Sequence, residues 1–199
     1  MLLDVQDSQL VLVDYQTKLM PALHEAEAVL RNGVRLAQMA QLLKVPTWGT
    51  EQNPERLGPN PPEIREVCRR TLAKMAFGAC EEGLVEWLRP QASAPSGNAR
   101  SLPRHLQKAV PAPARNTVVV AGCEAHVCLL QTALGLLEEE FDVWVVTDAC
   151  GSRTERNRDA AFDRLAAAGA ELLTTEMVAF EWLRSAEHPQ FKAVQALIK

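Results

Sequence analysis

Continuous apolar stretches alternate along the chain with stretches in which apolar residues recur every three or four positions. The first kind predicts strands, because a strand covered on both faces needs no polar side. The second kind predicts amphipathic helices. The strands expected are 9–14, 46–50, 117–121, 141–147 and 170–175, and the helices expected are 25–43, 81–88, about 126–137, 155–168, 176–183 and 188–198.

This alternation of strands and helices predicts an α/β fold with a mostly parallel sheet covered on both faces. Residues 69–80 are ambiguous, since they could form an irregular third strand followed by the start of a helix. A chain of 199 residues is long enough for one such domain and short for two, so we expect a single domain over 1–199. Residues 89–115 are rich in Pro, Ala and Ser and predict a loop insertion, with one helical turn at 104–108.

Composition and charge are those of an ordinary globular protein and weigh against several partners. Hydrophobic residues make up 47% of the chain, charged residues 23%, and the net charge is −4, which favours neither nucleic acid nor an anionic membrane. No apolar run reaches membrane-spanning length, and the acidic residues among the first twenty argue against a signal peptide. The five cysteines have no framework spacing, so we expect free thiols and a cytoplasmic location.

Several familiar site motifs are missing from the sequence. It contains no G-x-G-x-x-G dinucleotide fingerprint, no G-x-x-x-x-G-K-[ST] phosphate loop, no G-x-S-x-G elbow and no H-E-x-x-H zinc motif. Cys123, His126 and Cys128 lie close together, but their spacing matches no standard zinc knuckle and no fourth ligand is evident. We therefore expect neither a metal nor a cofactor.

The segment 117–137 carries the strongest chemical signal. Gly122 interrupts its apolar strand, and Cys128 follows in the first turn of the predicted helix. Backbone N–H groups and the dipole at a helix N-terminus lower the pKa of a thiol, and the same N–H groups can receive an oxyanion. Cys128 is therefore a candidate nucleophile. The alternative is a small side chain buried beneath the sheet, because cysteine is among the most buried residue types.

Two further charged residues are candidates by position. Asp14 ends the first predicted strand, and ligands of parallel sheets gather at the carboxyl ends of the strands. Lys74 stands within an apolar run, where it is either near an anion or extended to solvent. A lone aspartate is more often a helix cap or a loop residue. The three residue types nevertheless suit a single reaction, in which Asp14 takes the proton of Cys128 and Lys74 stabilises the thiolate.

These residues lie in stretches that resemble the isochorismatase-like cysteine hydrolases, and in particular the isochorismatase domain-containing hydrolases. The stretches are LVLVDYQTKLMPAL, VPTWGTEQNPERLGP, KMAFGAC, and GCEAHVCLLQTAL followed by VVTDACGSR. The resemblance covers most of the chain. It implies a three-layer α/β/α sandwich with a mostly parallel six-stranded sheet, and a homo-oligomer such as a dimer or tetramer.

The resemblance also implies the roles of individual residues. The family's catalytic triad falls on Asp14, Lys74 and Cys128. A cis peptide bond falls between Cys123 and Glu124, so that the backbone N–H groups of Glu124 and Cys128 form the oxyanion hole. Tyr15, Gln52, Phe77 and His126 are the expected residues of the substrate pocket.

This sequence also departs from parts of the family. The Asp-x-His metal motif of nicotinamidases is absent, since the corresponding region 50–54 contains no histidine. A metal-free member is therefore expected, and nicotinamide is disfavoured as a substrate. Isochorismatases proper lack the cysteine, so their vinyl-ether hydrolysis is disfavoured too.

The leading hypothesis is a cysteine-dependent hydrolase of a small amide or ureido compound, acting through an acyl-thioester. Two alternatives remain open. One is a catalytically silent scaffold or binding protein that keeps the fold. The other is a thiol redox sensor, in which Cys123 or Cys150 resolves an oxidised Cys128.

Overall fold

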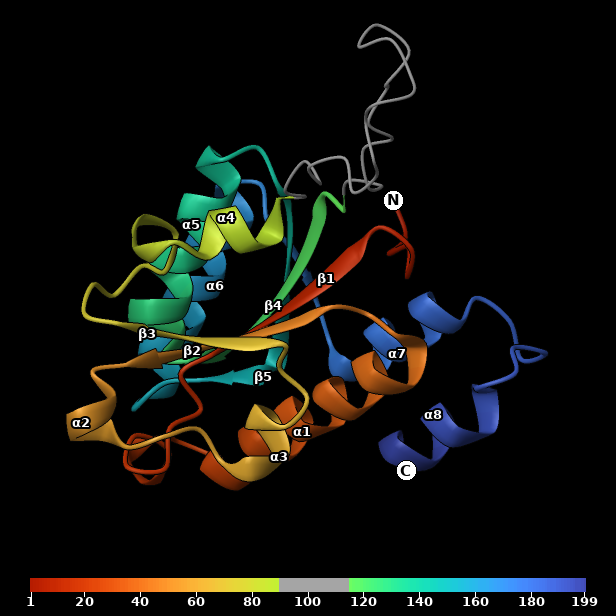
Figure 1. Cartoon of the computed structure of the whole chain (residues 1–199), viewed down its shortest axis with the longest axis horizontal. Coiled ribbons are helices and arrows are strands. Elements are labelled where there is room, and N and C mark those ends of the chain that lie inside the picture. The colour runs from red at the N-terminus through yellow and green to blue at the C-terminus, as the bar shows by residue number, and fades with distance from the viewer. Residues whose placement is uncertain (90–114) are drawn as a thin grey trace, which may run out of the picture.

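The computed structural model describes residues 1–89 and 115–199. A parallel six-stranded sheet forms the middle layer, with strand order β3-β2-β1-β4-β5-β6. Its strands are β1 (Ser8–Val13), β2 (Thr47–Gln52), β3 (Arg70–Lys74), β4 (Thr117–Cys123), β5 (Asp142–Gly151) and β6 (Glu171–Leu173). The predicted α/β fold and its three layers are confirmed (Figure 1).

Helices cover both faces of the sheet (Figure 1). On one face, α1 (Ala26–Leu43) contacts α3 (Pro62–Arg65), α7 (Thr175–Leu183) and α8 (Phe191–Ile198). On the other face, α5 (Leu130–Glu138) contacts α6 (Glu155–Ala167) and the 3-10 helix η2 (Cys80–Glu82), which leads into α4 (Leu84–Leu88). The remaining short helices among the described residues are η1 (Met20–Ala22), α2 (Pro54–Leu57) and the π-helix η4 (Ala125–Leu129).

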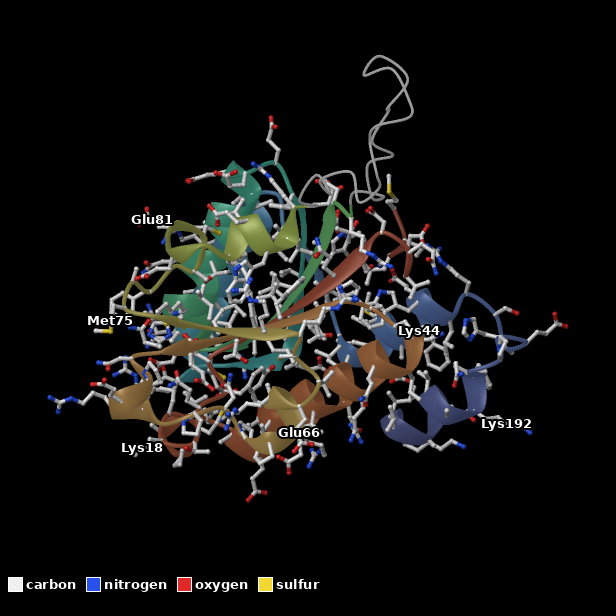
Figure 2. All side chains as sticks on the ribbon, in the orientation of Figure 1. Lys18, Lys44, Glu66, Met75, Glu81 and Lys192 are labelled. Atoms are coloured by element: carbon white, nitrogen blue, oxygen red, sulfur yellow. The ribbon has the colours of Figure 1, made fainter. Side chains whose placement is uncertain are left out.

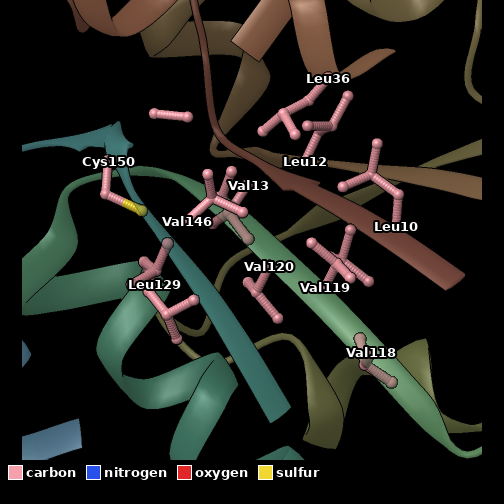
Figure 3. Packing of buried hydrophobic residues seen from close by; sticks show 14 of the residues in the cluster. Leu10, Leu12, Val13, Leu36, Val118, Val119, Val120, Leu129, Val146 and Cys150 are labelled. Carbon is pink, nitrogen blue, oxygen red and sulfur yellow. The ribbon is translucent and has the colours of Figure 1, made fainter. Parts of the chain in front are cut away.

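The core explains why the central strands are apolar at nearly every position. Each residue of β1 and of β4 is buried, since helices cover both faces of these strands. Figure 3 shows Leu10 and Leu12 of β1 beside Val118, Val119 and Val120 of β4. This packing fixes the positions of the ends of β1 and β4, after which Asp14 and the turn that contains Cys128 follow.

Several predicted boundaries shift. The ambiguous region 69–80 contains the short strand β3 and then an irregular turn. The strand predicted to end at residue 147 continues to Gly151, because after an irregularity β5 pairs again with the end of β4. The helix predicted at 81–88 is split into η2 and α4 at Gly83, whose φ is 104°.

The predicted insertion at 89–115 lies outside the described residues except for its two ends. Those ends meet, because the Gln9 side-chain amide donates to the carbonyls of both Leu88 and Arg115 at 2.9 Å. The helical turn predicted at 104–108 lies outside the described residues. In the part of the chain that is described, no helix has the length and apolar character needed to cross a membrane.

Candidate active site

The carboxyl ends of β1 and β4 form the base of the candidate site. The two strands are neighbours, and the chain order of the sheet reverses between them, which is where open parallel sheets bind ligands. They approach closely: a Cβ on Gly122 would lie 2.0 Å from the carbonyl oxygen of Val13, and the φ of Gly122 is 142°. Only glycine fits both conditions. This contact brings Asp14 next to the turn that leads from Cys123 to Cys128.

Asp14 follows β1 in a left-handed conformation, with φ 49°, and its side chain is fully buried. Its Oδ1 accepts a hydrogen bond from the hydroxyl of Thr50 at 2.6 Å. Its Oδ2 lies 2.9 Å from Nζ of Lys74, whose side chain is fully buried as well. Lys74 therefore does not extend to solvent, and Asp14 is not a simple helix cap.

The Lys74 ammonium is held from three directions. Besides Asp14, its Nζ donates to Oε1 of Gln52 and to the carbonyl oxygen of Phe77, each at 2.9 Å. The carbonyl oxygen of Ala76 lies further away, at 3.4 Å. An ammonium has three protons, so the three contacts at 2.9 Å use all of them. These partners offset the cost of burying the charge.

Cys128 lies in the π-helix η4 rather than in the first turn of an α-helix, which corrects the predicted start of this helix. Both Val127 and Leu129 donate their backbone N–H to the carbonyl oxygen of Glu124, at 3.0 and 3.2 Å, and this makes the wide turn. Asp14 and Lys74 lie close enough to Cys128 to shift the pKa of its thiol, Asp14 upward and Lys74 downward. The structure therefore brings the three predicted catalytic residues together.

The expected direction of the Cys128 pKa is wrong. The residue is only 5% exposed, and burial first, then the charge of Asp14, raises the pKa of the thiol to about 12. Lys74 acts in the opposite direction but does not outweigh them. A helix terminus favours the thiolate, whereas the loss of water around the thiol disfavours it more strongly here. Cys128 therefore keeps its proton at neutral pH in this arrangement.

Side chains of the turn before Cys128 contact side chains of the loop after β5. The peptide bond between Cys123 and Glu124 is cis. Oε1 of Glu124 lies 2.8 Å from Nε of Arg153, and Nδ1 of His126 lies 3.0 Å from the hydroxyl of Ser152. These contacts hold the backbone N–H groups of the turn in place next to the thiol.

The four expected pocket residues have different positions. Gln52 contacts Lys74, and Phe77, which is 52% exposed, supplies a carbonyl to the same lysine. His126 contacts Ser152. Tyr15 is not part of a pocket: its ring lies against Gly33 of α1 and its hydroxyl donates to the carbonyl of Ala149 in the core. Its position follows the left-handed conformation of Asp14, which ends the extended backbone of β1.

Three residues of the site have no counterpart among the candidates from the sequence. Thr50, Ser152 and Arg153 contact Asp14, His126 and Glu124 respectively. Thr50 stands at the end of a predicted strand, and Ser152 and Arg153 follow another, so the position at a strand's carboxyl end is the available signal. In residues 1–89 and 115–199, no group of three or more His, Cys, Asp and Glu side chains is arranged to hold a metal ion.

Two further cysteines are buried near the site. Cys123 and Cys150 stand at the ends of the neighbouring strands β4 and β5, and burial raises the pKa of Cys123 well above its usual value and that of Cys150 to about 12. The charge of Cys150 contributes to the shift of Cys123. With Cys128, three thiols thus stay protonated in the native state at pH values where they would ionise in the unfolded chain.

We expect alkaline solution to destabilise the protein. Between the ordinary thiol pKa near 9 and the raised values, the unfolded chain releases protons that the native state retains, so stability is present below pH 9 and is lost as pH rises. The loss is on the order of 1 kcal/mol per thiol at one pH unit above its ordinary pKa, and Cys68 and Cys80, whose pKa values burial also raises to about 12, add to it. Urea unfolding at pH 7.5 and pH 10 measures the difference. Cys150→Ala should show a smaller drop than the wild type, and equal stability at both pH values would contradict the raised pKa values.

Comparisons with known proteins agree with this fold. The Isochorismatase domain profile matches residues 8–177. Isochorismatase domain-containing protein 2A from Mus musculus is 34% identical over 195 residues, which cover 98% of this chain and 84% of the mouse protein.

Three solved structures are similar over nearly the whole chain. MAR1 ribonuclease from Caenorhabditis elegans has a TM-score of 0.83 and 30% identity, covering 100% of this chain and 92% of that one. YcaC from Pseudomonas aeruginosa, with hexane-2,5-diol and covalent acrylamide, has a TM-score of 0.80 and 28% identity, covering 98% and 91%. The YcaC gene product of Escherichia coli, an octameric hydrolase of unknown specificity, has a TM-score of 0.80 and 29% identity, covering 98% and 87%.

Proposed function

This chain belongs to the isochorismatase domain family, and we propose that it is a cysteine hydrolase of a small amide or ureido compound. One observation carries the proposal: Cys128 stands beside a buried carboxylate, Asp14, that is paired with a buried ammonium, Lys74, and both charges shift the pKa of its thiol. Packing alone does not account for this arrangement, because burying two charges and a thiol together is costly. It supplies a nucleophile, a base and a fixed positive charge.

In the proposed first half-reaction, sulfur attacks the substrate's carbonyl carbon while the thiol proton passes to Asp14. The thiol is protonated at neutral pH, so proton removal belongs to the attack and does not precede it. The negative charge that develops on the carbonyl oxygen is received by the backbone N–H groups of Glu124 and Cys128. The C–N bond then breaks, and the amine leaves with the proton from Asp14. An acyl-thioester on Cys128 remains.

In the second half-reaction, water attacks the thioester and gives a proton to Asp14. The C–S bond breaks, the acid is released, and the sulfur regains its proton. Lys74 stays charged throughout, because all three of its protons are engaged with fixed acceptors. It therefore stabilises the negative charge as it moves between sulfur and carboxylate.

The similar YcaC structure from Pseudomonas aeruginosa contains covalent acrylamide, so a nucleophilic group of that protein reacted with this reagent. Acrylamide is both a small amide and a reagent that adds to thiols. For this chain it provides a probe of Cys128 that needs no knowledge of the natural substrate.

A small substrate is proposed here although a similar structure is named a ribonuclease. The net charge of −4 does not favour a polyanion, and the Lys74 ammonium is fully engaged inside the protein. We propose that the reaction uses neither a metal nor a cofactor. We also propose that the protein is cytoplasmic and forms a single domain, in which 89–115 is an insertion.

We also propose a homo-oligomer, a dimer or tetramer, because the similar Escherichia coli protein is octameric. Leu2, Met177 and Phe180 form an exposed apolar patch that a second copy could cover, with 56%, 45% and 43% of their surfaces exposed. Light scattering of the purified protein measures its mass, and a monomer at all concentrations would contradict this part of the proposal.

The proposed function is tested by incubating the protein with small primary amides, N-substituted amides and ureido compounds. An RNA oligonucleotide is included as a substrate for the alternative ribonuclease activity. Release of ammonia, amine or shortened RNA is measured before and after treatment with acrylamide. The proposal expects turnover of at least one amide or ureide, lost as Cys128 is alkylated. Cleavage of the RNA alone, or turnover that continues with Cys128 fully alkylated, would overturn it.

A further inference from the structure

The turn after β3 supplies the carbonyl that holds the catalytic lysine, and its side chains do little to hold the turn itself. Met75 and Phe77 are 67% and 52% exposed, so they bury little apolar surface. Figure 2 shows Met75 at the edge of the molecule. The conformation of residues 75–77 must therefore rest mainly on hydrogen bonds.

Those hydrogen bonds come from two side chains on opposite sides of the turn. On the inner side, the Gln52 amide donates to the carbonyl oxygen of Met75 at 2.8 Å and accepts from Lys74 with its Oε1. On the outer side, Oε1 of Glu82 accepts from the backbone N–H of Ala76 at 2.8 Å and of Met75 at 3.1 Å. A single carboxylate oxygen thus fixes two consecutive peptide units.

From these contacts we infer that Glu82 is a positioning residue: it orients the turn 75–77 so that the carbonyl of Phe77 holds the ammonium of Lys74 against Asp14 and Cys128. The connection is direct at every step, from Glu82 to the N–H groups of the turn, from the Phe77 carbonyl to Nζ, and from Nζ to Asp14. The two backbone hydrogen bonds also lower the pKa of Glu82, which agrees with a carboxylate that is used as an acceptor. Glu82 is exposed and touches no reacting atom.

The chain provides a matched control in Glu81. It precedes Glu82 in the same 3-10 helix η2, is exposed, and accepts no hydrogen bond from the turn in the part of the chain that the structure describes. Figure 2 shows it at the outer surface. Any general effect of removing a negative charge from η2 should appear in both Glu81→Ala and Glu82→Ala.

The experiment measures the rate at which acrylamide alkylates Cys128 at pH 9, with the site identified by peptide mass. Lys74 lowers the pKa of Cys128, so a less firmly held lysine leaves less thiolate and slows alkylation. We expect Glu82→Ala to slow it by about threefold or more. Glu82→Gln, which keeps an acceptor oxygen, and Glu81→Ala should stay close to the wild-type rate, with unchanged melting temperatures for all three variants.

Equal rates in Glu82→Ala and Glu81→Ala would overturn the inference, and so would an equal slowing in Glu82→Gln and Glu82→Ala. The effect on turnover rests on the proposed function: Glu82→Ala should lower kcat by about tenfold and leave KM nearly unchanged. The alkylation rate does not depend on a substrate. A failure of the proposed function would therefore leave the positioning role measurable.

Discussion

Replacement of Cys128 by alanine is expected to lower the hydrolysis of any accepted amide by about 10⁴-fold or more. The variant lacks the atom that forms the acyl-thioester, so both half-reactions are lost together. Asp14 and Lys74 remain paired with each other. We expect substrate binding, measured by calorimetry, to persist within a few-fold, while product formation in a direct assay falls to background.

Cys68→Ala is the matched control for this variant. Cys68 is a free thiol too, although only partly buried, and it donates to the carbonyl of Ile64. It lies before β3, at the opposite end of the strand from Lys74. Its replacement should leave turnover close to the wild-type value. If Cys128→Ala retained a tenth of the activity, Cys128 would not be the nucleophile.

Asp14→Asn should change turnover and thiol reactivity in opposite directions. Turnover should fall by about 10³-fold, because an amide cannot take the proton of Cys128. The charge of Asp14 raises the pKa of Cys128, so its removal should lower that pKa. Alkylation of Cys128 by iodoacetamide at pH 8 should therefore become faster while catalysis is lost.

Two measurements distinguish this result from a loss of activity caused by unfolding. The variant removes the carboxylate that balances the buried charge of Lys74, so its melting temperature must be recorded alongside both rates. Asp163→Asn, which changes an exposed carboxylate on α6, should alter neither rate. Turnover within tenfold of wild type in Asp14→Asn would show that another group takes the proton.

The sequence is sufficient to predict the sheet and the three central residues. Continuous apolar runs identify β1 and β4, and polar residues directly after buried parallel strands must meet at one edge of the sheet. Gly122 marks the place where the two backbones approach each other. Lys74 is a candidate because a lysine in an apolar run needs either solvent or an anion, and the structure supplies Asp14.

The interactions that tune the site cannot be predicted from the sequence. The pKa of Cys128 depends on how much water the fold removes from the thiol, which is a property of the tertiary packing. The position of the Tyr15 side chain depends on the left-handed conformation of Asp14, which directs the ring toward Gly33 of α1. Glu82 and Arg153 act through an irregular turn and a loop, for which no periodic pattern predicts contacts.

The central claim is that Cys128 carries the acyl group of the substrate during turnover. It is tested most directly by quenching the protein in acid during hydrolysis of an accepted amide and mapping the modified peptide by mass spectrometry. We predict an added mass equal to the acyl part of the substrate on the peptide that contains Cys128, absent from Cys128→Ala. Turnover with no acyl group on that peptide in repeated quenches, or with the acyl group on another residue, would contradict it.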